Sequence, residues 1–134
     1  MNRKKTYLPL SQREEDLGRE IVDAAYQVHR KLGPGLLERV YEACFCYELA
    51  KKGIKFKRQA DVPMYYDDVL LSDTFRVDVY VEELIICELK SVEQINPIWP
   101  LQIVSHLVIS RKRLGYLINF NVRRIKDGIR RFIN

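Results

Sequence analysis

Residues 75–90 decide the fold class, and they read Phe75-Arg76-Val77-Asp78-Val79-Tyr80-Val81, Glu82-Glu83 and Leu84-Ile85-Ile86-Cys87-Glu88-Leu89-Lys90. The apolar patterns before and after the two glutamates predict two antiparallel strands joined by a tight loop. A three-residue loop over 82–84 places one apolar row opposite another, namely Val77, Val79 and Val81 opposite Leu89, Cys87 and Ile85. A two-residue loop would mix charged residues into that row. The pattern therefore favours the three-residue loop, which sets Asp78 opposite Glu88 on the other face.

Two carboxylates facing each other carry the first chemical indication. Directly opposed residues have Cβ atoms about 4.5–5.5 Å apart, so Asp78 and Glu88 repel unless a cation or proton intervenes. Such a pair meets the minimum for Mg²⁺, which takes oxygen ligands and keeps several waters beside substrate phosphates. Lys90 points to the same face, where its ammonium can orient an attacking water. The same residues also suit a salt-bridge ladder through the diagonals Arg76–Glu88 and Asp78–Lys90, so register alone leaves both interpretations open.

The segments around this strand pair follow two periodicities. Apolar spacings of three and four predict helices over 14–32, 36–52 and 100–112, and a short basic terminal helix marked by Ile125, Ile129 and Ile133. Period-two patterns predict one long or two short strands over 54–66 and further strands over 69–81 and 84–90. An unbroken apolar run predicts a buried strand over 115–120. The order predicts an α/β fold in which helices flank a mixed sheet.

Length and composition exclude several classes of protein. The chain has 134 residues, 47% hydrophobic and 31% charged, which indicates a single domain over 1–134, with 1–13 expected as a flexible N-terminal segment. The apolar runs are far shorter than the roughly 18 residues of a membrane span, and no apolar core of a signal peptide follows the basic start. Cys44, Cys46 and Cys87 match no zinc spacing, so we expect reduced core cysteines in a cytoplasmic protein.

Positive charge is concentrated in the last third of the chain. Residues 97–134 carry a net charge of +7, although the whole chain carries only +5. This distribution suits a phosphate-backbone partner, and a merely solvated helix face is the alternative. The candidate nucleic-acid-binding residues are Arg111, Lys112, Arg113, Arg123, Arg124, Lys126, Arg130 and Arg131.

A family resemblance strengthens the catalytic interpretation. The motif Gly35-Leu36-Leu37-Glu38-Arg39-Val40-Tyr41 resembles the signature of the GxxExxY family, a branch of the PD-(D/E)xK nuclease superfamily. The segments Phe75-Arg76-Val77-Asp78, Glu88-Leu89-Lys90, Gln102 and 115–121 follow in the order of that family, and the similarity covers about residues 14–134. The resemblance implies a restriction-endonuclease-like αβββαβ core, here with an additional N-terminal helix and a short C-terminal one.

The resemblance also implies a site. Asp78, Glu88, the carbonyl of Leu89 and the helix carboxylate of Glu38 are expected to hold Mg²⁺ or Mn²⁺. Lys90 resembles the water-orienting lysine, and Gln102 the residue supplied by the following helix. The implied activity is hydrolysis of phosphodiester bonds in DNA or RNA.

Departures from the family pattern leave an alternative open. Trp99-Pro100-Leu101 replaces a His-Glu-Ala-like approach to Gln102, and His106 and Val108 stand where the family tends to have tyrosine and a basic residue. A catalytically inactive nucleic-acid-binding or protein-interaction module of the same fold is therefore the alternative function. Many nucleases act as dimers, so a homodimer is a further expectation.

Overall fold

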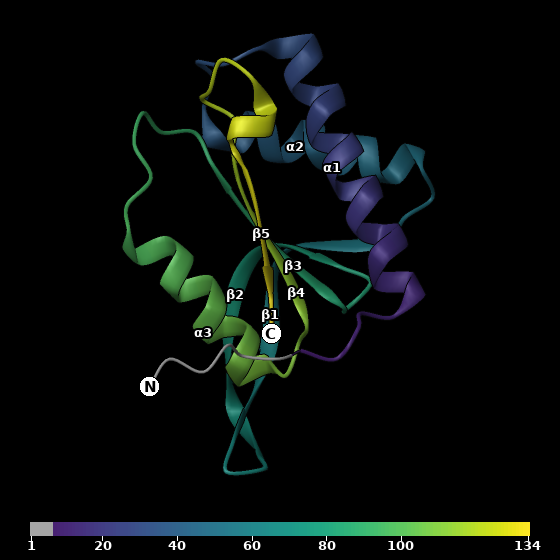
Figure 1. Cartoon of the computed structure of the whole chain (residues 1–134), viewed down its shortest axis with the longest axis vertical. Coiled ribbons are helices and arrows are strands. Elements are labelled where there is room, and N and C mark those ends of the chain that lie inside the picture. The colour runs from purple at the N-terminus through teal and green to yellow at the C-terminus, as the bar shows by residue number, and fades with distance from the viewer. Residues whose placement is uncertain (1–6) are drawn as a thin grey trace.

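The computed structural model describes residues 7–134 and contains a five-stranded sheet with helices on both faces (Figure 1). The helices are α1 (Gln12–Leu32), α2 (Glu38–Lys51) and α3 (Ile98–Ser110). The strands are β1 (Phe56–Tyr66), β2 (Val69–Val81), β3 (Ile85–Lys90), β4 (Leu114–Asn119) and β5 (Ile129–Ile133), and the short 3₁₀ helix η1 (Ile125–Asp127) precedes β5.

The sheet is mixed, as the sequence predicts. Its spatial order is β1-β2-β3-β4-β5, with β3 and β4 parallel and all other neighbours antiparallel. The parallel pair requires a crossover, which α3 supplies, because parallel strands cannot be joined by a tight turn. The run from α2 to β4 therefore follows the αβββαβ order, and the predicted α/β fold is confirmed.

Two apolar cores lie on opposite faces of the sheet. Alternate residues of β3, such as Cys87 and Leu89, pack against α1 and α2, whereas Ile86 packs against α3. The side chains of Glu88 and Lys90 share the parity of Ile86 along the strand and so belong to the α3 face. Alternate residues of β3 therefore point to opposite faces of the sheet, and Glu88 and Lys90 both lie on the face that α3 covers.

The predicted register of the central hairpin is confirmed over three residue pairs. Val81 lies opposite Ile85, Tyr80 opposite Ile86, and Val79 opposite Cys87, which leaves residues 82–84 as the loop. The prediction for Val77 is wrong, because this residue packs in the α3-side core with Ala60 and Val62. The alternation of β2 is broken at Asp78, which lies between two residues that face different cores.

The C-terminal segment departs from its predicted helix. Residues 129–133 form β5, which pairs with β4 through Ile129–Ile118 and Ile133–Leu114. The isoleucines recur every four residues, and that spacing places them on one side of a strand as well as of a helix. The free edge of β4 supplies backbone partners that a helix could not use, so the strand forms.

The helix predicted over 36–52 is observed as α2, which begins at Glu38. Leu37, directly before it, is 62% exposed, and Val40 is 36% exposed. The residues that pack inward are Tyr41, Phe45 and Leu49, at spacings of four. Apolar residues occur on both sides of this helix, and the sheet selects the more aromatic stripe.

The N-terminal segment is partly anchored. Residues 1–6 of the segment expected to be flexible lie outside the described residues. A capping box between Ser11 and Glu14 begins α1, and the guanidinium of Arg113 donates hydrogen bonds to the carbonyls of Leu8 and Pro9. Leu8, Pro9 and Ser11 are therefore held by hydrogen bonds to the rest of the fold. Within residues 7–134, no helix combines the length and apolar character needed to cross a bilayer.

Candidate functional site

The N-terminus of α2 is fixed beside the carboxyl end of β3. The Tyr41 hydroxyl donates to the carbonyl of Gly33 at 2.6 Å and accepts from the amide of Leu36 at 3.1 Å. The hydroxyl of Ser91, directly after β3, donates to the carbonyl of Leu36 at 2.6 Å. These three bonds lock the turn between α1 and α2 and place Glu38, the first residue of α2, at the end of the sheet where Lys90 lies.

Asp78 and Glu88 meet where β2 and β3 begin to separate. The amide of Leu89 donates to Oδ2 of Asp78 at 2.8 Å, and the amide of Asp78 donates to Oε1 of Glu88 at 3.4 Å. At this point the two strands are joined by hydrogen bonds from backbone amides to carboxylate side chains, and not by hydrogen bonds between backbone groups. The two carboxylates are neighbours, as the predicted register requires.

Burial changes the protonation of this pair. Desolvation raises the pKa of Glu88 to about 8, and the negative charge of Asp78 adds to the rise while Lys90 opposes it. Glu38 is exposed at the rim, yet partial desolvation of its carboxyl raises its pKa, an effect that Lys90 opposes. Asp78 also acts on Glu38, so the three carboxyl groups and Lys90 form one electrostatic unit.

The salt-bridge ladder does not form in the described residues. Arg76 is paired with Asp61 at 3.9 Å and not with Glu88, and no ion pair joins Asp78 to Lys90. The ammonium of Lys90 instead lies 4.2 Å from the centroid of the Trp99 ring, a cation–π contact. The charged face of β2 and β3 is therefore left without the neutralising pairs that a purely structural role would supply.

A cavity of about 190 Å³ brings Gln102 to the same place. Its lining includes Glu88, Lys90 and Gln102, together with Arg76, Trp99 and His106. The ring of His106 stacks on Phe75 with centroids 4.3 Å apart, burial lowers the pKa of His106, and its Nδ1 is the buried side-chain atom without a hydrogen-bond partner in the described part of the chain. Glu38, Asp78, Glu88, Lys90 and Gln102 thus gather at one end of the sheet.

Three residues that the sequence did not single out support Asp78. Nε2 of Gln59 donates to Oδ1 of Asp78 at 3.2 Å and to Oε1 of Glu42 at 2.7 Å. Oε2 of Glu42 accepts two bonds from Arg58, at 3.0 and 3.2 Å. Alternation places Gln59 opposite Asp78, but nothing in the sequence indicates that the two side chains bond.

The donor set suits a hard divalent cation. Among residues 7–134, no three His, Cys, Asp or Glu side chains converge closely enough to hold a metal ion by themselves. Asp78 and Glu88 still supply the two carboxylates that Mg²⁺ requires, because this ion takes its other ligands from water, carbonyls and phosphate. The donor chemistry fits such an ion, because Asp78 and Glu88 are neighbours and a bound cation would offset their mutual repulsion.

The predicted basic residues divide into two groups. Arg111 pairs with Asp68 and lies over the Tyr65 ring, Arg113 binds carbonyls of Leu8, Pro9 and Asn134, and Arg131 pairs with Glu15. Lys57 and, to a smaller extent, the positive charge of Lys112 lower the pKa of Glu83 in the β2–β3 loop. The guanidinium of Arg130 lies over the Phe132 ring. Arg111, Arg113, Arg130 and Arg131 therefore make intramolecular contacts, and Arg111, Lys112 and Arg113 lie at the end of the sheet opposite Lys90.

The other group lies at the end of the sheet that carries Lys90. Arg123, Arg124 and Lys126 follow β4 at the end where the amide of Phe120 donates to the carbonyl of Lys90 at 2.9 Å. Arg124, which also pairs with Asp127 at 3.8 Å, and Lys126 line a surface groove of about 730 Å³ that also includes Arg19, Asp23 and Arg30 of α1.

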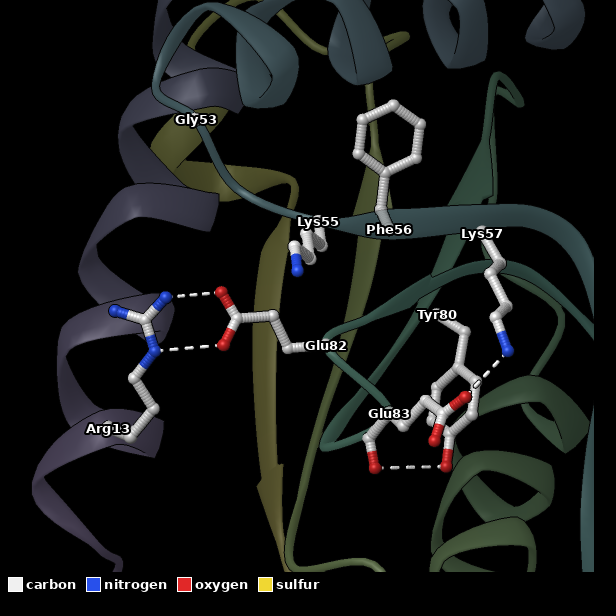
Figure 2. Close-up of a pocket in the computed structure, with 8 residues that line it drawn as sticks. All are labelled: Arg13, Gly53, Lys55, Phe56, Lys57, Tyr80, Glu82 and Glu83. Atoms are coloured by element: carbon white, nitrogen blue, oxygen red, sulfur yellow. Dashed lines mark hydrogen bonds and ion pairs between the residues drawn. The ribbon is translucent and has the colours of Figure 1, made fainter.

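A second cavity, of about 560 Å³, lies at the far end of the sheet and contains none of the predicted site residues. Figure 2 shows Arg13 of α1 paired with Glu82, and Lys57 of β1 paired with Glu83, so that both glutamates of the β2–β3 loop are in ion pairs. Glu82 and Glu83 are each neutralised by an ion pair, whereas, within residues 7–134, Asp78 and Glu88 are not. We therefore place the candidate site at the smaller cavity.

Two sets of residues outside the site have structural roles. Nε2 of His29 bonds the carbonyl oxygen of Val122 at 2.7 Å, which ties α1 to the segment after β4. The cysteines form no disulfide, and burial raises the pKa of Cys46 to about 12 and that of Cys87 well above its ordinary value. Thiols with such pKa values are poor nucleophiles and poor metal ligands.

Comparison with known proteins identifies one family. The model of the PD-(D/E)XK nuclease superfamily matches residues 15–132, a range that contains every predicted site residue. No curated protein and no solved structure matches the chain.

Proposed function

The chain belongs to the PD-(D/E)XK nuclease superfamily, and on this basis we propose that it is a metal-dependent nuclease hydrolysing phosphodiester bonds in DNA or RNA. The observation that carries the proposal is the Asp78–Glu88 pair, in which burial and mutual repulsion raise the pKa of Glu88 to about 8. The repulsion between the two carboxylates destabilises the metal-free protein, and a pKa shift of this size is typical of a functional site. The motif around Glu38 further supports placement in the GxxExxY branch.

We assign the metal-binding role to Asp78 and Glu88, with the carbonyl of Leu89 and the carboxylate of Glu38 as additional oxygen donors. The ion is Mg²⁺ or Mn²⁺, because both accept this all-oxygen donor set. When bound, it supplies Lewis-acid activation of a water and of the scissile phosphate. Glu38 lies at the rim and reaches the ion directly or through a water.

Lys90 and Gln102 act on the substrate side of the pocket. The Lys90 ammonium orients the attacking water and offsets negative charge that develops on the phosphate. Its contact with Trp99, at 4.2 Å, limits the positions that a flexible lysine side chain can adopt. Gln102 lines the same cavity and holds the substrate by its amide group.

We assign the phosphate-backbone contacts chiefly to Arg123, Arg124 and Lys126. They lie at the end of the sheet that carries Lys90, and two of them line the basic groove along α1. Such contacts position the backbone without reading sequence, and they weaken steeply as salt is added. A dissociation constant independent of salt would exclude this role.

The second candidate is an inactive nucleic-acid-binding or protein-interaction module. The contact of Lys90 with Trp99 favours it, since an ammonium that lies over an indole ring is partly occupied by that ring. The intact carboxylates favour the nuclease. In a module that only binds nucleic acid, two neighbouring carboxylates would repel the phosphate groups and weaken binding.

We also propose that the protein forms a homodimer in the cytoplasm. α3 contains no Asp, Glu, Lys or Arg, and its outward residues Leu101, Val104 and Val108 are 62%, 41% and 53% exposed. Their spacing of three and four matches a helix–helix seam. Light scattering tests the dimer, with Leu101→Glu expected to yield a monomer. The three unpaired cysteines support a reducing compartment.

The experiment that tests the nuclease is cleavage of single-stranded, double-stranded and branched DNA and RNA with Mn²⁺. The native chain is compared with Lys90→Ala and Glu88→Ala, each checked for folding by circular dichroism. Cleavage by the native chain that falls at least about 100-fold in both variants supports the proposal. Salt-sensitive binding without cleavage by any of the three would favour the inactive module.

A further inference from the structure

We propose that Gln59 is a positioning residue that fixes the carboxylate of Asp78 for metal binding. The inference rests on the proposed function and adds a residue to it. Gln59 lies on β1, and none of the motifs that carry the family resemblance contains it. Its role follows from three observations, concerning its backbone, its side chain and the group behind it.

The backbone of Gln59 is left-handed in the middle of a strand. β1 and β2 pair at Arg58–Val79 and again at Ala60–Val77, in one unbroken register. Between these pairs Gln59 faces Asp78, yet the two form no ladder pair, and Gln59 has φ of 46°. A residue with a Cβ adopts this conformation at a cost, and such strain concentrates at functional sites.

The side chain of Gln59 completes the environment of Asp78. Its Nε2 donates to Oδ1 of Asp78 at 3.2 Å, while the amide of Leu89 donates to Oδ2 at 2.8 Å. Each carboxylate oxygen therefore has one donor, which fixes the plane of the group and leaves acceptor capacity on both oxygens. A carboxylate held in this way loses little freedom when it binds a cation.

Glu42 keeps the Gln59 amide in place. Nε2 carries two hydrogens, and the second reaches Oε1 of Glu42 at 2.7 Å. Glu42 is 8% exposed and is itself neutralised by Arg58 through Oε2. The chain of contacts therefore runs from Arg58 through Glu42 and Gln59 to Asp78, and the amide cannot turn away without leaving Glu42 with one partner fewer.

A purely structural Gln59 makes a different prediction from a positioning one. If Gln59 serves only to satisfy Glu42, its replacement lowers the stability of the metal-free protein and leaves the metal affinity of the folded fraction unchanged. If Gln59 positions Asp78, the affinity falls even when stability does not. Gln59→Gly separates the two, because glycine accepts the left-handed backbone without strain.

The experiment measures Mn²⁺ affinity by isothermal titration calorimetry and the melting temperature of the metal-free protein. The proteins are the native chain, Gln59→Gly, Gln59→Asn and the control Asp67→Gly. Asparagine tolerates the left-handed region but is one methylene too short to join Glu42 and Asp78. Asp67 has φ of 49° in the β1–β2 turn, so its replacement relieves similar strain far from the site.

We expect both Gln59 variants to bind Mn²⁺ about tenfold more weakly, with melting temperatures within a few degrees of the native value. Asp67→Gly binds as the native chain does. On a cleaved substrate, kcat falls in the Gln59 variants while KM for the nucleic acid is unchanged.

Affinity within about twofold of native in either folded Gln59 variant overturns the inference, as does a loss that Asp67→Gly shares. Those results leave the proposed function standing, whereas an absence of Mn²⁺ binding by the native chain overturns both.

Discussion

Replacing Glu88 by glutamine is expected to stabilise the metal-free protein, by an amount that grows with pH. The pKa of Glu88 is raised from 4.5 to about 8 by burial and by Asp78. Between these two values the unfolded chain releases the proton and the folded chain retains it. The stability contributed by this group is therefore complete below pH 4.5, and it is lost as the pH rises toward 8.

The size of the effect follows from the shift. A rise from 4.5 to about 8 corresponds to about 5 kcal/mol above pH 8, at about 1.4 kcal/mol for each pKa unit, and this value is an upper limit. Glu88→Gln removes the loss, because a neutral amide mimics the protonated acid. We expect a gain of at least about 2 kcal/mol at pH 8.5 and little change at pH 4.5.

Urea unfolding followed by circular dichroism at both pH values measures this gain. Glu93→Gln is the control, since Glu93 is exposed on the loop after β3. An equal effect of Glu88→Gln at the two pH values would refute the assignment of a buried, protonated carboxyl. Added Mn²⁺ should reverse the order of stability, because it stabilises only a protein that retains the carboxylate.

Three further predictions concern other parts of the site and the fold. Mn²⁺ affinity should rise by up to about tenfold for each pH unit between 6 and 8 and then level off, since Glu88 must lose its proton to bind; calorimetry at pH 6, 7, 8 and 9 checks this, and a flat profile would contradict it. Tyr41→Phe should lower the free energy of unfolding by about 1–3 kcal/mol, measured with urea, because the Tyr41 hydroxyl links Gly33 to Leu36. A loss no larger than that of the exposed control Tyr47→Phe would contradict this prediction. Gly128→Ala should destabilise the fold by several kcal/mol, since an added Cβ would lie 2.0 Å from the carbonyl oxygen of Asn119; Gly53→Ala, at φ of 72° with nothing within 4 Å, should cost only about 1 kcal/mol.

The central hairpin could be predicted because its constraints are local. A strand with one buried face has a period of two, and a one-residue slip would have moved Asp78 into the apolar row. That constraint placed Glu88 and Lys90 on a common face and put Asp78 beside them. The three residue pairs that join β2 and β3 follow the predicted register.

The errors arise where tertiary contacts choose between patterns that the sequence permits equally. The isoleucines at 125, 129 and 133 suit a helix or a strand, and the open edge of β4 selects the strand. Val77 follows the alternation of its neighbours in sequence but packs on the opposite side, because the strand is distorted at Asp78. Gln59 could not be predicted at all, since glutamine in a strand has no sequence signal for a left-handed backbone.

The contact between Trp99 and Lys90 has a practical consequence. Trp99 is the one tryptophan of the chain, so its indole is the only such fluorophore in the unmodified protein. The ring lies 4.2 Å from the Lys90 ammonium and lines the cavity that holds Glu88. Indole emission depends on nearby charge and on access of water. The emission spectrum of the native protein is therefore an optical probe of the candidate site, without any label.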